Sequence, residues 1–83
     1  MKKRYEDSKF IIFWTNDNYI VVRKHGKYEQ HSHFKKFDGA KLLVDLYYKK
    51  IMPLNPYFKK AMERICTQNE LKQFTKEWKS WAV

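Results

Sequence analysis

The spacing of hydrophobic residues changes partway along the chain, and this change constrains the fold more than any other feature. Phe10–Trp14 and Tyr19–Lys24 are runs of β-branched and aromatic residues, a pattern typical of strands. Thr15–Asn18 is a turn cluster between them. We expect His25-Gly26 to form a two-residue hairpin loop with the glycine at positive φ, followed by a third strand from Lys27 to about His33. The first half therefore predicts a three-stranded antiparallel β-meander.

Helical spacing follows from residue 38 onward. Asp38 is placed to cap a first helix that Pro53 ends, Asn55-Pro56 begins a second, and Thr67–Glu70 has the pattern of a capping box before a third that reaches the chain end. The expected inner stripes are Ala40, Leu43, Val44, Tyr47 and Ile51, then Phe58, Ala61, Met62 and Ile65, then Leu71, Phe74, Trp78 and Trp81. The sequence predicts an α+β fold, a three-stranded antiparallel β-meander followed by three α-helices packed on one face.

The two faces of this meander differ in character. Directly opposed residues of a hairpin share a face. A turn at Asn16-Asp17 would place Phe13 opposite Ile20, and the second turn would place Ile20 opposite His31. We expect the face with Ile11, Phe13, Ile20 and Val22 to pack against the helices. The other face would then be open to solvent or to a partner, including a second copy in a homodimer. Its proposed contact residues are Trp14, Tyr19, Arg23 and Tyr28.

Length and composition limit the class of protein. With 83 residues the chain is long enough for one small domain, which we place at 9–83 after a flexible basic N-terminal segment at 1–8. Hydrophobic residues make up 43% and aromatic residues 18%, which excludes a disordered basic tail. A single small domain also excludes a deep catalytic cleft between lobes, so we expect a binding module and not an enzyme.

The charge balance points to an anionic partner. The formal net charge is +9, and the basic residues are 15 lysines and 3 arginines. Lysine suits phosphate contacts, whereas arginine is the usual reader of guanine edges, so we expect electrostatic binding to DNA or RNA. The alternative is an inhibitor or adaptor that docks on an acidic protein surface. A small phage or mobile-element protein would have this character. The candidate cationic contacts are Lys35, Lys36, Lys49, Lys50, Lys59 and Lys60.

Two histidines at alternate positions raise two further hypotheses. His31 and His33, with Glu29, are potential ligands on one face of a strand, but zinc sites need three or four donors and no second ligand pair follows at a familiar spacing. We therefore expect no metal and no cofactor. The same pair is suited to acid–base cleavage of RNA, which makes a small histidine-dependent RNase toxin the third functional hypothesis.

Cysteine usage and hydropathy predict the compartment. Cys66 is the one cysteine, so no internal disulfide is possible, and we expect a reducing, cytoplasmic environment. We expect Cys66 itself to be a small residue of the core. No apolar stretch approaches the length of about 20 residues that a membrane span needs, and we expect no membrane contact.

Two resemblances are limited to short features. Thr67–Leu71 resembles the opening of the first helix of a helix-turn-helix, although the expected short glycine turn does not follow. A three-stranded meander followed by a helix is similar in topology to the small sheet-reading DNA-binding domains of phage-type integrases. Neither resemblance identifies a family, and both imply DNA binding.

Overall fold

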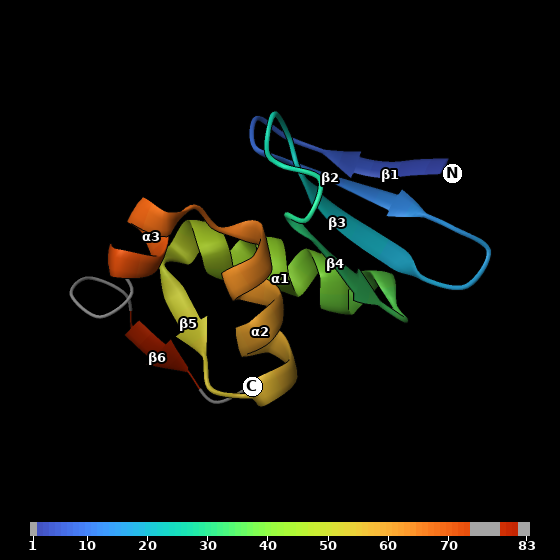
Figure 1. The fold of residues 1–83 in the computed structure, drawn as a ribbon. Coiled ribbons are helices and arrows are strands. Elements are labelled where there is room, and N and C mark those ends of the chain that lie inside the picture. Colours follow the sequence, from blue (N-terminus) through green and yellow to red (C-terminus); the bar gives the residue numbers. More distant parts are fainter. Residues whose placement is uncertain (1, 74–78, 82–83) are drawn as a thin grey trace.

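The computed structural model describes residues 2–73 and 79–81, and its architecture is α+β (Figure 1). Four strands form an antiparallel sheet in the order β1-β2-β3-β4, and two further strands form a separate parallel pair. Three helices follow the four-stranded sheet in the chain, and β5 lies between the first two of them. The elements are β1 (Lys2–Glu6), β2 (Phe10–Trp14), β3 (Tyr19–Arg23), β4 (His31–Phe34), α1 (Phe37–Lys49), β5 (Ile51–Pro53), α2 (Pro56–Ile65), α3 (Gln68–Gln73) and β6 (Lys79–Trp81).

The fourth strand of the sheet, β1, corrects the three-stranded prediction. It lies in the N-terminal segment that we expected to be flexible, and it pairs antiparallel with β2. Asp7 organises the connection, because its carboxylate accepts hydrogen bonds from the backbone N–H groups of Lys9 and Phe10, both at 2.8 Å. It also accepts one from the Tyr5 hydroxyl at 2.6 Å. A side chain that satisfies local backbone donors in this way favours a tight turn.

The first hairpin was predicted correctly and the second was not. Phe13 pairs with Ile20 as expected. The second connection spans residues 24–30 instead of two residues, and it is His25 and not Gly26 that has positive φ, at 58°. The Arg23 N–H closes this longer loop on the Gln30 carbonyl at 3.1 Å. Ile20 consequently pairs with His33, two residues beyond the predicted partner.

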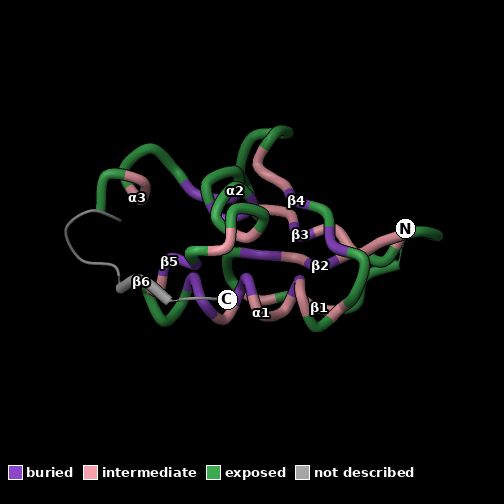
Figure 2. Tube along the Cα trace, turned by 90° about the horizontal axis from the view of Figure 1, so that it is seen from below, coloured by how far each residue is buried: buried purple, intermediate pink, exposed green. Residues whose placement is uncertain are grey.

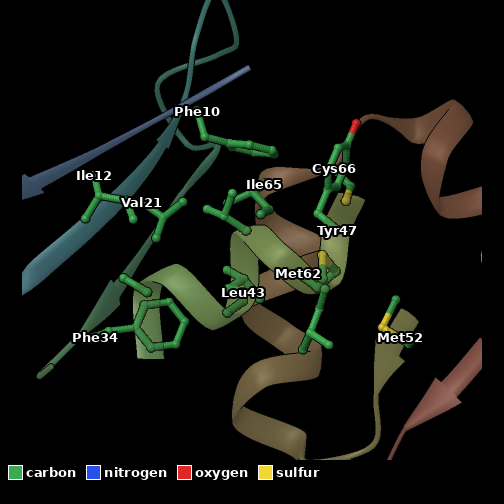
Figure 3. Packing of buried hydrophobic residues seen from close by; sticks show 14 residues of the cluster. Phe10, Ile12, Val21, Phe34, Leu43, Tyr47, Met52, Met62, Ile65 and Cys66 are labelled. Atoms are coloured by element: carbon green, nitrogen blue, oxygen red, sulfur yellow. The ribbon is translucent and has the colours of Figure 1, made fainter. Parts of the chain in front are cut away.

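The face of the sheet that packs against the helices is the opposite of the one that we predicted. Phe10, Ile12 and Val21 are completely buried and point towards α1 and α2 (Figure 3). Ile11, Phe13, Ile20 and Val22 are only half-buried on the other face. Both sets of alternate residues are apolar, so alternation alone does not select the inner one. The large aromatic rings of Phe10 and Phe34, which are both buried, belong to the inner set.

Helix α1 covers this inner face but differs from the prediction at both ends. Lys36 is its N-cap without a side-chain hydrogen bond, and Asp38 lies inside the first turn instead of capping it. There a carboxylate still interacts favourably with the helix dipole. The helix ends where Lys50 adopts a left-handed conformation, with φ of 56°. Ile51 therefore belongs to β5, and the buried stripe consists of Ala40, Leu43, Val44, Leu46 and Tyr47.

Helix α2 begins as predicted. The Asn55 side chain accepts hydrogen bonds from the backbone N–H groups of Tyr57 and Phe58, at 2.9 and 3.3 Å, and Pro56 occupies the first helical position. Its inner residues Ala61, Met62 and Ile65 are buried. In Figure 2 the buried turns of α1 lie on the side of the helix next to β2, and its exposed turns lie on the opposite side.

Helix α3 has the predicted cap but not the predicted length. The Glu70 N–H donates to Thr67 Oγ1 at 3.2 Å, and the Thr67 N–H donates to Glu70 Oε1 at 2.7 Å, which is the reciprocal pattern of a capping box. The continuous helix that we expected to reach Trp81 is wrong, because Lys79–Trp81 forms β6 beside β5. Phe74 and Trp78, which we assigned to the same helix, lie outside the described residues.

The assignment of sheet faces predicts different costs for neighbouring isoleucines. Ile12→Ala removes methyl groups from a fully buried site and should lower the free energy of unfolding by about 2–5 kcal/mol. Ile11→Ala, the matched control on the open face, should cost about 1 kcal/mol or less. Urea unfolding followed by circular dichroism measures both. A larger loss of stability for Ile11→Ala than for Ile12→Ala would indicate that the helices cover the face predicted from sequence.

Candidate nucleic-acid interface

Arg23, which we predicted to be a contact residue, is part of the interior. Its guanidinium donates to the two carboxylate oxygens of Glu70 at 2.8 and 3.2 Å and to the Ile65 carbonyl oxygen at 3.1 Å. It also lies over the rings of Phe10 and Tyr47, with centroid distances of 5.5 and 5.6 Å. Only 13% of the side chain is exposed. These partners give Arg23 a structural role in joining β3 to α3.

Glu70 is the acceptor at the centre of this network. In addition to Arg23, it accepts a hydrogen bond from the Tyr47 hydroxyl of α1 and caps the Thr67 N–H. Burial by itself raises the pKa of the Glu70 carboxyl, but the hydrogen bonds from Arg23 and Tyr47 outweigh it and lower this pKa to about 2. Burial and the adjacent Glu70 carboxylate raise the pKa of Tyr47. Glu70 is therefore ionised and Tyr47 is neutral at neutral pH.

The other aromatic contact residues are not gathered on one open face. Trp14 and Tyr19 pair with each other and lie on the same side of the sheet as the helices. Tyr19 packs against the Phe37 ring of α1, with centroids 5.8 Å apart, whereas Trp14 is 36% exposed at the end of β2. Tyr28 lies in the loop before β4 and is 92% exposed. Of these three, Tyr28 is the most accessible.

The six lysines that we predicted as cationic contacts are all exposed, but they do not lie together on one part of the surface. Lys35 and Lys36 directly precede α1, and Lys49 and Lys50 lie at its other end, about 20 Å away for a helix of this length. Lys50 lines a hollow of about 340 Å³ that also contains Glu70. The last doublet, Lys59 and Lys60, is in α2.

A stripe of polar and aromatic side chains on α2 faces the edge of β4. Tyr57, Lys60 and Arg64 are spaced i, i+3 and i+7, so they lie along one side of the helix. With His33 of β4, they line a hollow of about 300 Å³. Tyr57 also lines a second hollow of about 430 Å³, together with Lys35, Lys36 and Phe58. We call these two adjoining hollows the β4–α2 groove.

Direct hydrogen bonds hold the two walls of the β4–α2 groove together. The Ser32 hydroxyl of β4 donates to the Ala61 carbonyl oxygen of α2 at 3.0 Å. The Tyr57 hydroxyl donates to the His33 carbonyl oxygen. The Tyr57 ring also meets the buried Phe34 ring edge-on at 5.5 Å, yet the residue remains 56% exposed. A ring that is anchored at its edge and open on its surface is a suitable stacking platform.

The charge of the β4–α2 groove has one sign. Lys35, Lys36, Lys60 and Arg64 line it, and no aspartate or glutamate of the described residues does so. The contact residues predicted from sequence included the three lysines and omitted Tyr57 and Arg64. The available signal was the i, i+3, i+7 spacing of Tyr57, Lys60 and Arg64 beside the apolar stripe of the same predicted helix.

His31 and His33 lie on the open face of the sheet, with ring centroids 5.2 Å apart. Over the described residues, no three histidine, cysteine or acidic side chains form a group that would hold a metal ion, so Glu29 does not complete such a set. Cys66 is only 5% exposed, and burial raises the pKa of its thiol. The thiol is therefore a core group, as its position in the sequence predicted.

Comparison with known proteins adds no family to these observations. No family model, curated protein or solved structure matches the chain. In the part of the chain that the structure describes, no helix is long and apolar enough to cross a membrane.

The lowered pKa of Glu70 predicts an acid-dependent loss of stability. Its contribution to folding is fully present above about pH 4.5 and disappears as the pH falls to about 2, because the carboxyl then takes up a proton. Glu70→Gln should lower the free energy of unfolding at pH 7 by about 2–4 kcal/mol, since Arg23 loses its compensating charge. The difference in stability from wild type should shrink towards pH 2. A difference that does not depend on pH, measured by urea unfolding, would contradict the ion pair.

Proposed function

We propose that the protein is a small, basic, non-enzymatic module that binds single-stranded nucleic acid, DNA or RNA, in the β4–α2 groove. One observation carries the proposal: the exposed Tyr57 ring stands between two hollows that four cationic side chains line. Non-specific single-strand binders combine these elements, because bases stack on rings and phosphates bind cations. The net charge of +9 and the predominance of lysine agree with a small phage or mobile-element protein of this type.

The dimensions of the β4–α2 groove favour a single strand over a duplex. Its hollows, of about 300 and 430 Å³, are of a size for individual bases or small groups and not for a double helix. The exposed ring of Tyr57 offers a stacking surface only to a base that is not already stacked within a duplex. Tyr28, which is 92% exposed in the loop before β4, is a second accessible ring outside the groove.

Sequence selectivity should be weak. Of the four cations in the β4–α2 groove only Arg64 has the forked guanidinium that reads guanine edges, and the lysines act as point charges on phosphates. Affinity should therefore come mainly from counterion release and depend strongly on salt. Docking on an acidic protein surface is the alternative that the same charges support.

Two lysine pairs at opposite ends of α1 provide a matched test of location. Lys35→Gln with Lys36→Gln should weaken binding to a single-stranded oligonucleotide and flatten the slope of log K against log salt by about 0.7 for each phosphate that is no longer neutralised. Lys49→Gln with Lys50→Gln removes the same charge away from the groove and should change the slope much less. Fluorescence anisotropy across a salt series measures both. Equal losses of affinity in the two double variants would show that the oligonucleotide does not bind mainly in the β4–α2 groove.

Aromatic variants test the stacking surface separately from the charge. Tyr57→Ala should weaken single-strand binding by about 1–3 kcal/mol without changing the salt slope, and Tyr57→Phe, which keeps the ring, should retain most of the affinity. Trp14→Ala is the control at an exposed ring outside the groove. Normal binding by Tyr57→Ala would overturn the stacking platform while leaving the cationic contacts intact.

The same titration distinguishes the competing functions. Absence of binding to both single strands and duplexes at low salt would overturn the proposal in favour of an acidic protein partner. RNA recovered from the assay should be intact on a denaturing gel. Cleavage that disappears in the variant with His31→Ala and His33→Ala would instead establish an RNase.

A further inference from the structure

His31 and His33 are arranged as a pair of ligands on the edge strand β4. They occupy alternate positions of the strand, so both side chains lie on the face that the helices leave open. Their ring centroids are 5.2 Å apart, and the ring planes are inclined at 69°. The two imidazoles are therefore close neighbours on one face of the strand.

One nitrogen of each ring already has a partner. The Nδ1 atom of His31 lies 2.8 Å from the Tyr28 carbonyl oxygen, which only accepts, so this nitrogen carries the proton. The Nδ1 atom of His33 lies 3.4 Å from Asn18 Oδ1. A proton on Nδ1 leaves Nε2 as the unprotonated nitrogen. Metal-binding histidines have this arrangement, because a second partner fixes the tautomer and aims the other nitrogen at the ion.

The separation of the rings agrees with a chelate. Zinc binds imidazole nitrogen at about 2.0–2.1 Å, so each ring centroid would lie roughly 3.2 Å from the ion. At the tetrahedral angle, two such centroids would be about 5.2 Å apart. The observed centroid distance of 5.2 Å agrees with this value.

The strand that carries the pair is held in place. Ser32, between the two histidines, hydrogen-bonds to the Ala61 carbonyl oxygen, and the Tyr57 hydroxyl donates to the His33 carbonyl oxygen. Both bonds join β4 to α2. An ion would therefore meet ligands whose backbone is already ordered, and this lowers the entropic cost of binding.

We propose that His31 and His33 together bind one divalent transition-metal ion of the class that prefers imidazole, such as Zn²⁺, through their two Nε2 atoms. Imidazole ligands favour Zn²⁺, Cu²⁺ and Ni²⁺ over Mg²⁺ and Ca²⁺. No third protein ligand joins them among the described residues, which is the reason that we expected no metal from the sequence. Water would fill the remaining positions, and we expect weaker binding than at a site with three or four protein ligands. This site does not rest on the proposed nucleic-acid binding.

Calorimetric titration of the untagged chain with zinc chloride tests the site directly. We expect one ion per chain, and His31→Ala or His33→Ala should each weaken binding at least tenfold because a chelate becomes a single ligand. His25→Asn is the matched control, since it removes the third histidine of the chain from a loop position where asparagine tolerates the observed φ of 58°. This variant should bind zinc as wild type does.

Copper provides an independent readout of the ligand set. The electron paramagnetic resonance spectrum of the Cu²⁺-loaded protein should show coupling to nitrogen that is lost when both histidines are replaced by alanine. Circular dichroism identifies any variant that fails to fold, and His31→Gln with His33→Gln then replaces it. Three results would overturn the proposal: unchanged zinc binding by folded variants of the pair, loss of binding in His25→Asn, or two chains for each ion.

Discussion

The ion pair between Arg23 and Glu70 connects two elements that lie far apart in the sequence, β3 and α3. Arg23 is the last residue of the inner strand β3, and Glu70 lies in the first turn of α3. The same carboxylate accepts a hydrogen bond from the Tyr47 hydroxyl of α1. With only 13% and 16% of the two side chains exposed, each charge depends on the other for compensation. Helix α3 has no fully buried residue of its own, so this ion pair and Leu71, which packs against the core, determine where α3 lies.

Because these contacts hold Arg23 in the interior, its charge is not part of the exposed cations at the β4–α2 groove. The exposed cations that remain near one another come from the loop before α1 and from one side of α2, and β4 lies against that side of α2. The hydrogen bonds of Ser32 and Tyr57 across this junction keep its shape. Tyr57 thus contributes to the packing of α2 on the sheet and, in our proposal, to stacking against a base.

Local signals in the sequence predicted local structure well. The Asn55 cap, the Thr67–Glu70 capping box and the first hairpin register are all present, because each depends on residues close together in the chain. The inner face of the sheet was not predictable from alternation, since both faces of β2 and β3 are apolar. The prediction that Arg23 is a contact residue was wrong for a related reason. The sequence of a strand shows neither which face its cation occupies nor that its partner lies 47 residues away. Likewise, the β4–α2 groove unites segments whose proximity arises only from packing.

We propose that nucleic acid occupies the β4–α2 groove, and the position of the bound strand along the chain distinguishes this groove from the other exposed lysines. Titration of the isotopically labelled protein with a short single-stranded oligonucleotide, followed in amide ¹H–¹⁵N correlation spectra, reports binding residue by residue. We predict that the largest shifts occur in residues 31–36 and 57–64, with small shifts at the far end of α1 around Lys49. Shifts concentrated at Trp14 and Tyr19, or at Lys49 and Lys50, would contradict binding in the β4–α2 groove.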